Sequence, residues 1–268
     1  MYELITSPSN QIIKDAKSLH KKRCRWDKRR FFIEGIRAVE ESIISNVDID
    51  YILYSDMLFG VKGGNELFDQ IKLLQCRVYH ISDKLFEEIT DTESPQGIFA
   101  SIKFNLCSLE KVLTDKENFF ILLDRVQDPG NMGTIIRTAD AFGSNGIIVT
   151  NGCVDVFNPK TIRSTMGSIF HVPLLYYNEI NDAIYDLKNR GIQIMSTALK
   201  SSNYCHDVDF KTDFALVIGN EASGVSEDII NASDSLIKIP MRGKAESLNA
   251  AIASAVIMYE VLRQRQNI

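Results

Sequence analysis

Short, wholly apolar runs alternate with helical segments in the second half of the chain, and this pattern restricts the fold more than any other feature. The runs at 119–123, 146–150 and 214–218 contain no charged residue, and further strands are predicted over 192–196 and 236–239. Strands that are apolar on both faces are typical of a parallel sheet covered by helices on each side. The sequence therefore predicts an α/β domain built on a parallel sheet. A final helix is expected from residue 247 to about 264.

The first hundred residues show a smaller alternation of strands and helices. The first 30 residues are predicted to form one polar helix that begins near Pro8-Ser9-Asn10. Strands are expected at 31–33, 51–54, 77–80 and 97–102, and helices at 37–45 and 66–74. The polar, helix-like stretch over 105–117 is interpreted as a linker. We therefore expect an α/β domain over 1–104, a linker over 105–117 and a parallel-sheet domain over 118–268.

The charge of the chain is unevenly distributed. The net charge is −5, yet residues 1–30 contain nine Lys and Arg against three acidic residues, which gives this segment +6 and the rest of the chain −11. A concentrated basic segment can bind phosphates by releasing counterions, even on an acidic protein. A solvated helix face is the alternative interpretation of the same segment. The residues expected to bind RNA are Lys21, Lys22, Arg23, Arg25, Arg29, Arg30 and Arg37.

Several classes of protein are disfavoured by what the sequence lacks. Five cysteines are scattered without a C-x-x-C pair, and of the four histidines only His206 is close to a cysteine. This argues against a disulfide framework or a metal site. No apolar stretch approaches the length of a membrane span, and the N-terminus does not resemble a secretory signal. We therefore expect a cytoplasmic protein that contacts no membrane.

Three unusual loops follow predicted strands, which is where parallel α/β sheets bind their ligands. The first loop covers residues 124–133 and leads into a helix that carries Arg137, six residues after Asn131. The spacing allows Asn131 and Arg137 to lie on the same side of the loop. The alternative is that Asn131 caps the helix and Arg137 is a surface charge, because Asp-Pro-Gly-Asn is also common in turns.

The second loop follows the apolar run at 214–218 and contains Gly219, Glu221 and Gly224. Its two glycines allow close approach of the backbone to a ligand, and Glu221 places a carboxylate at the strand end. The loop is neither G-x-G-x-x-G nor a P-loop, which disfavours a dinucleotide or nucleoside triphosphate fold.

The third loop, residues 239–249, leads into the final helix. Backbone groups around Ile239 and Met241 could bracket an adenine ring. Ser247 can cap the helix, and Asn249 is expected in its first turn. The small residues over 250–255 imply that another backbone, a ligand or a second subunit approaches closely.

Together the three loops resemble the three motifs of the SpoU (TrmH) RNA 2′-O-ribose methyltransferases of the SPOUT class. The matching patterns are Asn131-x-Gly133-x-x-x-Arg137, Gly219-x-Glu221-x-x-Gly224 and Ile239-Pro240-Met241-x-Gly243-x-x-x-Ser247-Leu248-Asn249. The segments 162–168 and 172–173 are also similar to that family. Residues 32–37 and 94–98 resemble an L30e-like substrate-binding domain that precedes the catalytic domain in many members.

The resemblance implies a catalytic domain with a deep trefoil knot and S-adenosyl-L-methionine as cofactor. It also implies a homodimer in which Arg137 completes an active site near the subunit boundary. The substrate implied is RNA, foremost 23S ribosomal RNA, with transfer RNA as the alternative. The residues that would bind the cofactor are Thr197, Gly219, Gly224, Ile239, Met241 and Leu248.

The chemistry implied is displacement at the activated methyl group by a ribose 2′-hydroxyl, whose proton must be removed. Arg137 is either locally deprotonated and acts as the base, or remains charged and stabilises the alkoxide while Glu221 or a phosphate accepts the proton. We favour the second hypothesis, and we expect Asn131, Ser247 and Asn249 to position substrate and cofactor.

Two rival functions use the same sequence features. One is a non-catalytic RNA-binding assembly factor, which intact Arg137, Glu221 and Asn249 disfavour. The other is an enzyme of small molecules with a nucleotide cofactor, which the basic segment and the missing phosphate-binding pattern disfavour.

Overall fold

The computed structural model describes residues 3–266, and the chain divides into two compact units. The first unit ends at Asn105 but also includes Phe157–Phe170. The second unit contains Leu106–Val156 and the residues from His171 onward. A segment from the middle of the predicted catalytic domain therefore packs with the N-terminal part of the chain.

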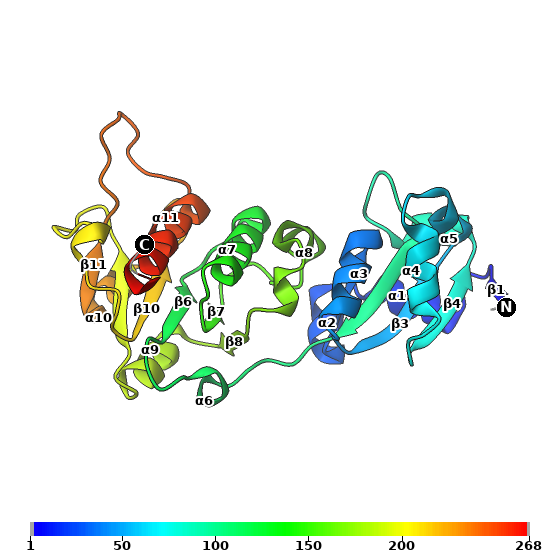
Figure 1. Cartoon of the computed structure of the whole chain (residues 1–268), viewed down its shortest axis with the longest axis horizontal. Coiled ribbons are helices and arrows are strands. Elements are labelled where there is room, and N and C mark those ends of the chain that lie inside the picture. Colours follow the sequence, from blue (N-terminus) through cyan, green and yellow to red (C-terminus); the bar gives the residue numbers. More distant parts are fainter. Residues whose placement is uncertain (1–2, 267–268) are drawn as a thin grey trace. The chain divides into compact units, whose positions relative to one another are not determined.

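A five-stranded mixed sheet forms the centre of the first unit (Figure 1). Its strands lie in the order β1-β4-β3-β5-β2. The strand β3 is parallel to β4 and antiparallel to β5, and β2 is also antiparallel to β5. The starts of β2, β3 and β4 and the end of β5 therefore meet at one edge of the sheet. The strands are β1 (Leu4–Ile5), β2 (Arg30–Glu34), β3 (Ile49–Tyr54), β4 (Arg77–Ile81) and β5 (Ile98–Lys103).

Helices α1 and α5 cover one face of this sheet. Side chains such as Ile13 of α1 and Phe86 of α5 pack on Tyr51 and Phe99 in a single apolar cluster. Helix α1 begins where the Asn10 side chain accepts a hydrogen bond from the Ile12 N–H at 2.9 Å. The helical elements of the unit are α1 (Gln11–Ser18), α2 (Lys22–Lys28), α3 (Ile36–Ile44), η1 (Asp56–Gly60), α4 (Gly64–Ile71), α5 (Asp83–Ile89), α8 (Pro159–Thr165) and η2 (Ser168–Phe170).

The single helix predicted over the first 30 residues is wrong, since the segment forms β1 and two short helices. The helices α1 and α2 are separated because Arg25, which is buried, donates hydrogen bonds to the carbonyl oxygens of Leu19 (2.7 Å) and His20 (2.9 Å). Its guanidinium thus takes the place of the N–H donors that a continuous helix would supply. Strand β1 and helix α5 were not predicted.

Aromatic packing explains why residues 157–170 belong to the first unit. The Phe157 ring stacks on Phe104 with 3.8 Å between ring centroids and on Phe31 with 4.9 Å. The Trp26 ring of α2 meets Phe157 edge-on at 5.9 Å. Such contacts add about 0.5–1.5 kcal/mol per pair beyond area burial, and the cluster fixes this segment on β2, α2 and the residue that follows β5.

The second unit contains the predicted parallel sheet. Its six strands lie in the order β11-β9-β10-β6-β7-β8, and all neighbouring pairs are parallel, which confirms the fold class expected from the apolar runs. Strand β8 was not predicted. The strands are β6 (Phe119–Leu123), β7 (Gly146–Thr150), β8 (Leu174–Tyr177), β9 (Gln193–Thr197), β10 (Phe214–Ile218) and β11 (Ser235–Ile237).

Helices cover both faces of the parallel sheet (Figure 1). Residues of α9 and α10, such as Leu187 and Ile229, pack on Phe120 and Val217 on one face, and α7 and α11 pack against each other on the other. Leu109 of α6 belongs to the first of these cores, so part of the predicted linker is packed into the second unit. The helical elements are α6 (Leu109–Val112), α7 (Pro129–Ala141), α9 (Ile180–Lys188), η3 (Cys205–Asp207), α10 (Glu227–Ala232) and α11 (Ala250–Gln266).

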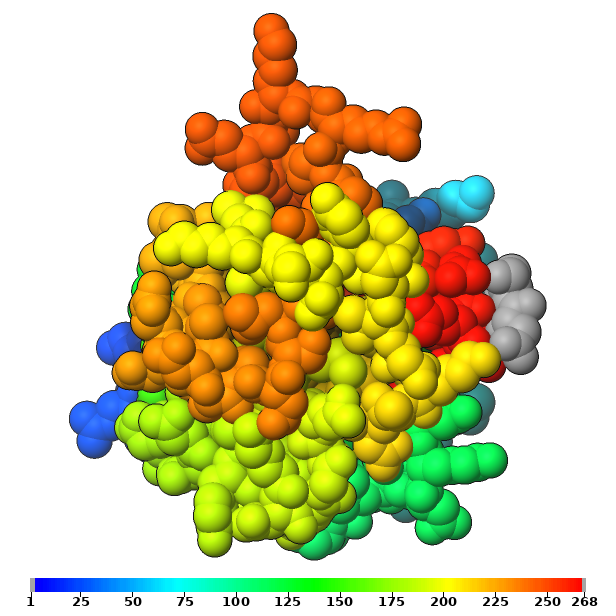
Figure 2. Space-filling model, turned by 90° about the vertical axis from the view of Figure 1, so that its left-hand side faces the viewer, coloured from blue at the N-terminus to red at the C-terminus, as the bar shows by residue number. Residues whose placement is uncertain are grey.

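The connection between β11 and α11 projects from the body of the second unit (Figures 1 and 2). Residues 240–247 are all exposed, and within residues 3–266 no hydrogen bond holds 239–248 to the rest of the unit. This loop carries most of the third sequence motif. In the part of the chain that the structure describes, none of the helices has the length and apolar character needed to cross a membrane. The same part holds no group of three or more His, Cys, Asp or Glu side chains placed to bind a metal.

Candidate active site

The strands that precede the three loops end at the same edge of the parallel sheet. Leu123 of β6 is paired with Ile218 of β10, and Ile237 of β11 is paired with Thr197 of β9. Since β9 and β10 are neighbours as well, the four carboxyl ends lie in a row. Parallel α/β proteins bind ligands at this edge, and the loops that follow these strands contain the predicted site residues.

The Glu221 carboxylate joins the second loop to the first. Its Oε1 accepts hydrogen bonds from the Asn131 side-chain amide at 2.9 Å and from the Asp128 N–H at 3.2 Å, and its Oε2 accepts one from the Gln127 N–H at 3.2 Å. Partial burial opposes ionisation, but the donors of Asn131 and of the backbone outweigh it and lower the pKa of Glu221 below its usual value. Glu221 is therefore a charged, hydrogen-bonded anchor.

Asn131 extends this connection to the third loop. While its amide nitrogen donates to Glu221, its side-chain oxygen accepts a hydrogen bond from the Asn249 amide at 2.9 Å. Asn131 is buried, so it could not lose either partner without leaving a polar group unsatisfied. The chain Asn249–Asn131–Glu221 thus links all three loops with two side-chain hydrogen bonds.

The helix caps differ from those considered for the sequence. Asp128, not Asn131, caps α7, because its carboxylate accepts the Asn131 N–H at 2.8 Å. Asn249 rather than Ser247 caps α11, with its side-chain oxygen accepting the N–H groups of Ala251 (2.9 Å) and Ile252 (3.3 Å). Ser247 is exposed in the projecting loop. Asn131 is consequently free to connect the loops.

Two further polar residues, which the sequence reasoning missed, hold the first and second loops together. The buried Asp124 accepts hydrogen bonds from the Ser226 N–H at 2.8 Å and from Arg125 Nε at 2.9 Å. The Asn220 amide donates to the Arg125 carbonyl oxygen at 2.9 Å. Both residues come directly or almost directly after an apolar strand, and that position was the available signal.

The glycines of the second loop are required by the turn itself. A Cβ at Gly219 would lie 2.2 Å from the carbonyl carbon of Gly224, so the two backbone segments could not approach as they do. Gly224 has a φ of +68°, which side chains rarely adopt. Asn220 and Gly224 exchange backbone hydrogen bonds of 2.9 and 3.1 Å across the turn. This geometry exposes the loop backbone at the sheet edge.

Arg137 is not joined to the polar chain. It lies roughly 240° around α7 from Asn131, and its side chain is exposed whereas Asn131 is buried. Among residues 3–266 it makes no hydrogen bond or ion pair. Its guanidinium is therefore available to a group outside this chain.

The predicted cofactor residues lie at the same edge as the polar chain. The Thr197 hydroxyl donates to the Val217 carbonyl oxygen at 3.2 Å, which fixes the ends of β9 and β10 together. Met241 is exposed and Leu248 is half-buried in the projecting loop. Backbone groups at neighbouring strand ends, apolar side chains and one carboxylate are what an adenosine ring, its ribose and a sulfonium require. The residues present thus fit S-adenosyl-L-methionine.

The residues predicted to bind RNA fall into different environments. Lys21, Lys22, Arg23 and Arg29 are exposed around α2, and Arg37 is exposed at the start of α3. Arg25 is buried and bound to backbone carbonyl groups. Arg30 is mostly buried between Asp15 and Asp50. Arg29 and Arg30 are at one end of β2 and Arg37 is just beyond its other end, so these cations do not form one surface.

Fold and site together define a parallel α/β protein with a ligand site at the carboxyl edge of its sheet, attached to a mixed-sheet unit. The chain belongs to the SpoU rRNA methylase family, whose model matches residues 118–259. The MRM3-like substrate binding domain matches residues 10–100. The resemblance drawn from the three motifs is thereby confirmed.

Characterised relatives match the chain along nearly its whole length. It is 37% identical over 260 residues to the 23S rRNA (guanosine(2553)-2′-O)-methyltransferase RlmP of Bacillus subtilis, covering 96% of this chain and 98% of that protein. The crystal structure of an AdoMet-bound rRNA methyltransferase from Sinorhizobium meliloti is similar with a TM-score of 0.86, 31% identity and 98% coverage of both chains. The SpoU methyltransferase AviRb from Streptomyces viridochromogenes in complex with AdoMet has a TM-score of 0.87 at 28% identity, covering 96% of this chain and 98% of that one.

Proposed function

We propose that this protein transfers the methyl group of S-adenosyl-L-methionine to a ribose 2′-hydroxyl of 23S ribosomal RNA. The observation that carries the proposal is the hydrogen-bonded chain Asn249–Asn131–Glu221, which joins the three family motifs at the sheet edge where ligands bind. The names of RlmP and the AdoMet-bound relatives support the same reaction and cofactor.

Arg137 is the residue best placed to act on the substrate. It is exposed and makes no hydrogen bond or ion pair with the residues described, so its charge is not already neutralised. An arginine remains protonated in proteins, and a fixed cation stabilises the negative charge that develops on the ribose oxygen. Arg137 is thus assigned as the stabiliser of the alkoxide.

Glu221 is better assigned to positioning than to accepting the proton. Its lowered pKa makes it a weak base, and Gln127, Asp128 and Asn131 already donate to its two oxygens. The proton of the 2′-hydroxyl would instead pass to a phosphate of the RNA or to solvent. Asn131 and Asn249 hold the loops in register, and Ser247, which is exposed in the projecting loop, would meet the substrate there.

The cofactor would lie against Thr197, Gly219 and Gly224, and the projecting loop would supply Ile239, Met241 and Leu248. When bound, the cofactor brings a methyl group already activated by its sulfonium, so no metal is needed for the transfer. The chain's own contribution would be to close the projecting loop over the bound cofactor and so exclude water from the reacting atoms.

An apolar stripe on α11 supports a homodimer. Ile252, Val256 and Tyr259 are 51%, 40% and 52% exposed and recur at the spacing of one helix face. A second copy of the chain is the proposed occupant, with Arg137 of the neighbouring α7 close to the subunit boundary. Light scattering tests this: the protein should have twice its formula mass, and Val256→Glu should halve it.

We also propose a cytoplasmic location, a trefoil knot in the second unit, and RNA binding by the N-terminal domain over 1–104. The match to a substrate-binding domain and the exposed cations of α2 support the last of these. A ribosomal RNA substrate supports the cytoplasmic location, because ribosomes are found there.

The decisive experiment supplies purified protein and S-adenosyl-L-methionine with a labelled methyl group to ribosomal and transfer RNA from a strain that lacks the protein. Label should enter 23S ribosomal RNA and resist alkaline hydrolysis at one position, since a 2′-O-methyl group blocks cleavage there. Label found only in transfer RNA would mean that the substrate is transfer RNA and not 23S ribosomal RNA. Binding of RNA without transfer of label would favour a non-catalytic assembly factor.

A further inference from the structure

A charged cavity lies in the first unit, at the edge of the mixed sheet where β2, β3 and β4 begin and β5 ends. Its volume is about 580 Å³, within the range of pockets that hold small ligands. All of its lining residues belong to the first unit, so it shares no residue with the proposed methyl-transfer site. Twelve residues line it: Ile5, Asn10, Gln11, Ile12, Asp15, Lys28, Arg30, Asp50, Tyr51, Arg77, Tyr79 and Lys103.

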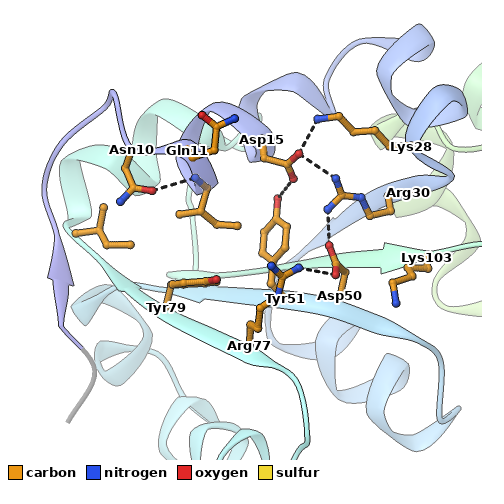
Figure 3. A pocket seen from close by; sticks show the side chains of 12 residues that line it. Asn10, Gln11, Asp15, Lys28, Arg30, Asp50, Tyr51, Arg77, Tyr79 and Lys103 are labelled. Carbon is orange, nitrogen blue, oxygen red and sulfur yellow. Dashed lines mark hydrogen bonds and ion pairs between the residues drawn. The ribbon is translucent and has the colours of Figure 1, made fainter.

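Two carboxylates deep in the cavity hold three of its cations, Lys28, Arg30 and Arg77, in fixed positions (Figure 3). Asp15 accepts hydrogen bonds from Lys28 Nζ at 2.6 Å and from Arg30 at 2.9 Å, and also from the Tyr51 hydroxyl at 2.9 Å. Asp50 binds the other side of Arg30 and accepts a hydrogen bond from Arg77 at 2.6 Å. The side chains of the cluster are therefore ordered before a ligand binds, which lowers the entropy cost of binding.

The lining contains more positive charge than these carboxylates neutralise. Four cations, Lys28, Arg30, Arg77 and Lys103, face two carboxylates. Lys103 also pairs with Asp48, which lies outside the lining, and the whole group still carries one excess positive charge. Like charges gathered around a hollow repel one another, and an anion with one negative charge would relieve that repulsion.

Exposure places the available donors at the mouth of the cavity. The side chains of Lys28, Lys103 and Arg77 are 34%, 47% and 58% exposed, whereas those of Asp15, Arg30 and Asp50 are between 14% and 18% exposed. Arg77 uses only one of its nitrogens on Asp50. Its remaining N–H groups can bind a phosphate in the two-point geometry that guanidinium favours.

Part of the cavity wall is apolar and lies beside the first turn of α1. Ile5, Ile12 and Tyr79 form this part of the wall, and Asn10 and Gln11 add amide donors and acceptors. Helix α1 has no acidic residue in its first turn, so its positive end is not neutralised there. A planar base and a ribose fit such a wall, whereas a bare phosphate would leave most of the volume unfilled.

We propose that this cavity binds a nucleotide of the RNA substrate, with its phosphate at Lys28, Arg77 and Lys103 and its base against Tyr79, Ile5 and Ile12. The inference rests on the proposed function in one respect, namely that the macromolecule bound is RNA. It adds a nucleotide site made of residues outside the sequence motifs described above.

The test uses the full-length protein and measures binding directly, without the cofactor. Calorimetry with guanosine and uridine 5′-monophosphates, inorganic phosphate and a single-stranded RNA oligonucleotide should show that nucleotides or RNA bind more tightly than phosphate. The double variant Arg77→Gln/Lys103→Gln should weaken that binding about tenfold or more. It should also reduce the dependence of RNA affinity on salt by a slope of about one to two.

Lys72→Gln is the matched control, because Lys72 is a half-exposed lysine of the same unit that pairs with one exposed aspartate, as Lys103 does. It should leave both measurements unchanged. Circular dichroism should show that all variants are folded, since Arg30, Asp15 and Asp50 are left intact.

Three results would overturn the inference. They are unchanged RNA affinity in the double variant, inorganic phosphate binding as tightly as the nucleotides, and displacement of bound RNA by polyglutamate as effectively as by the nucleotides. Failure of the proposed function has a different signature. If no RNA accepts a methyl group while the double variant still loses nucleotide binding, the cavity assignment stands and the reaction assigned to the second unit falls.

Discussion

The two units place their polar clusters at opposite kinds of sheet edge. In the second unit every strand runs in the same direction, so the carboxyl ends gather the three loops and the Asn249–Asn131–Glu221 chain forms there. In the first unit strands run both ways, and the charged cavity lies where the parallel strands β3 and β4 begin. In the parallel sheet, the direction of the strands determines which edge carries the polar cluster. In the mixed sheet, the positions of the charged side chains determine it.

The clusters also differ in what holds them. The second unit uses neutral amides and one carboxylate, with Arg137 left unpaired among the described residues. The first unit uses ion pairs around Arg30, which connect three cations, Lys28, Arg30 and Arg77, through two carboxylates. We infer that the unpaired charge of Arg137 serves the reaction, whereas most of the charges in the first unit are paired and fix the shape of the cavity.

The largest effect should come from Arg137→Ala, which tests whether the unpaired charge of Arg137 is catalytic. Methyl transfer should fall about 10²- to 10³-fold, as when other donors to a developing oxyanion are removed. The affinity for S-adenosyl-L-methionine and the melting temperature should hardly change, because Arg137 is exposed and contacts neither partner of the polar chain. Single-turnover assays and calorimetry measure this, and retained activity would remove Arg137 from the mechanism.

Stability should separate the two clusters next. Asp15→Ala leaves Lys28, Arg30 and the Tyr51 hydroxyl without their shared acceptor, and partial exposure limits the cost to about 2 kcal/mol of unfolding free energy. Asn131→Ala should cost about 1–3 kcal/mol from the unsatisfied partners Glu221 and Asn249.

The single tryptophan assigns each of these effects to its unit. Trp26 packs on Phe104 and Phe157 in the first unit, so its fluorescence follows that unit in urea, while circular dichroism follows the whole chain. Asp15→Ala should shift the fluorescence midpoint, and Asn131→Ala should shift only the circular dichroism. The reverse pattern would contradict the division of labour between the clusters.

Acidification should weaken both units. The pKa of Glu221 is lowered from 4.5 although burial opposes this, since Asn131 and the backbone donate to it, and that of Asp15 is lowered from 3.8 against burial by Lys28, Tyr51 and Arg30. A carboxylate with a lowered pKa in the folded state contributes stability that is complete above these unfolded values and is lost as pH falls below them.

Melting temperatures between pH 7 and pH 3 measure the loss. Glu221→Gln should flatten the acid slope seen by circular dichroism and leave that of Trp26 fluorescence unchanged, because Asp15 still titrates in the first unit. A slope that Glu221→Gln does not change would show that its carboxylate adds no stability to the folded state.

The smallest effect should be local protection of the projecting loop. Arg242 and Lys244 are exposed there and offer trypsin two cleavage sites. If S-adenosyl-L-methionine closes the loop, saturating cofactor should slow cleavage there several-fold and leave cleavage after Arg23 in α2 unchanged. Mass spectrometry of the fragments separates the two sites, and equal rates with and without cofactor would speak against closure.

Much of the second unit could be predicted from the sequence, because its strands are apolar on both faces and its motifs follow them. The parallel sheet and the convergence of Asn131, Glu221 and Asn249 follow from that pattern. The caps did not, since Asp128 and Asn131 both suit a helix start and only the fold decides between them. Nor did the contacts of Asp124 with Ser226 and of Asn220 with the Arg125 carbonyl group, because these partners are distant in sequence.

The first unit was less predictable because long-range contacts override its local pattern. The basic segment reads as one helix, but the buried Arg25 satisfies the carbonyl groups at the break between α1 and α2. Arg30 looks like a free cation in the sequence, whereas Asp15 and Asp50 enclose it. Asp50 is 20 residues away from it, so no local pattern reveals that pair.

The packing of Phe157 on aromatic rings of the first unit limits how such a protein can be divided or recombined. A fragment that stops near residue 105 would carry Phe31 and Phe104 with their stacking partner removed, and it should aggregate. Exchange of this N-terminal region for that of a relative would likewise require residues 157–170 to travel with it. A single cut in the chain therefore cannot divide this protein into two fragments that each keep all their packing partners.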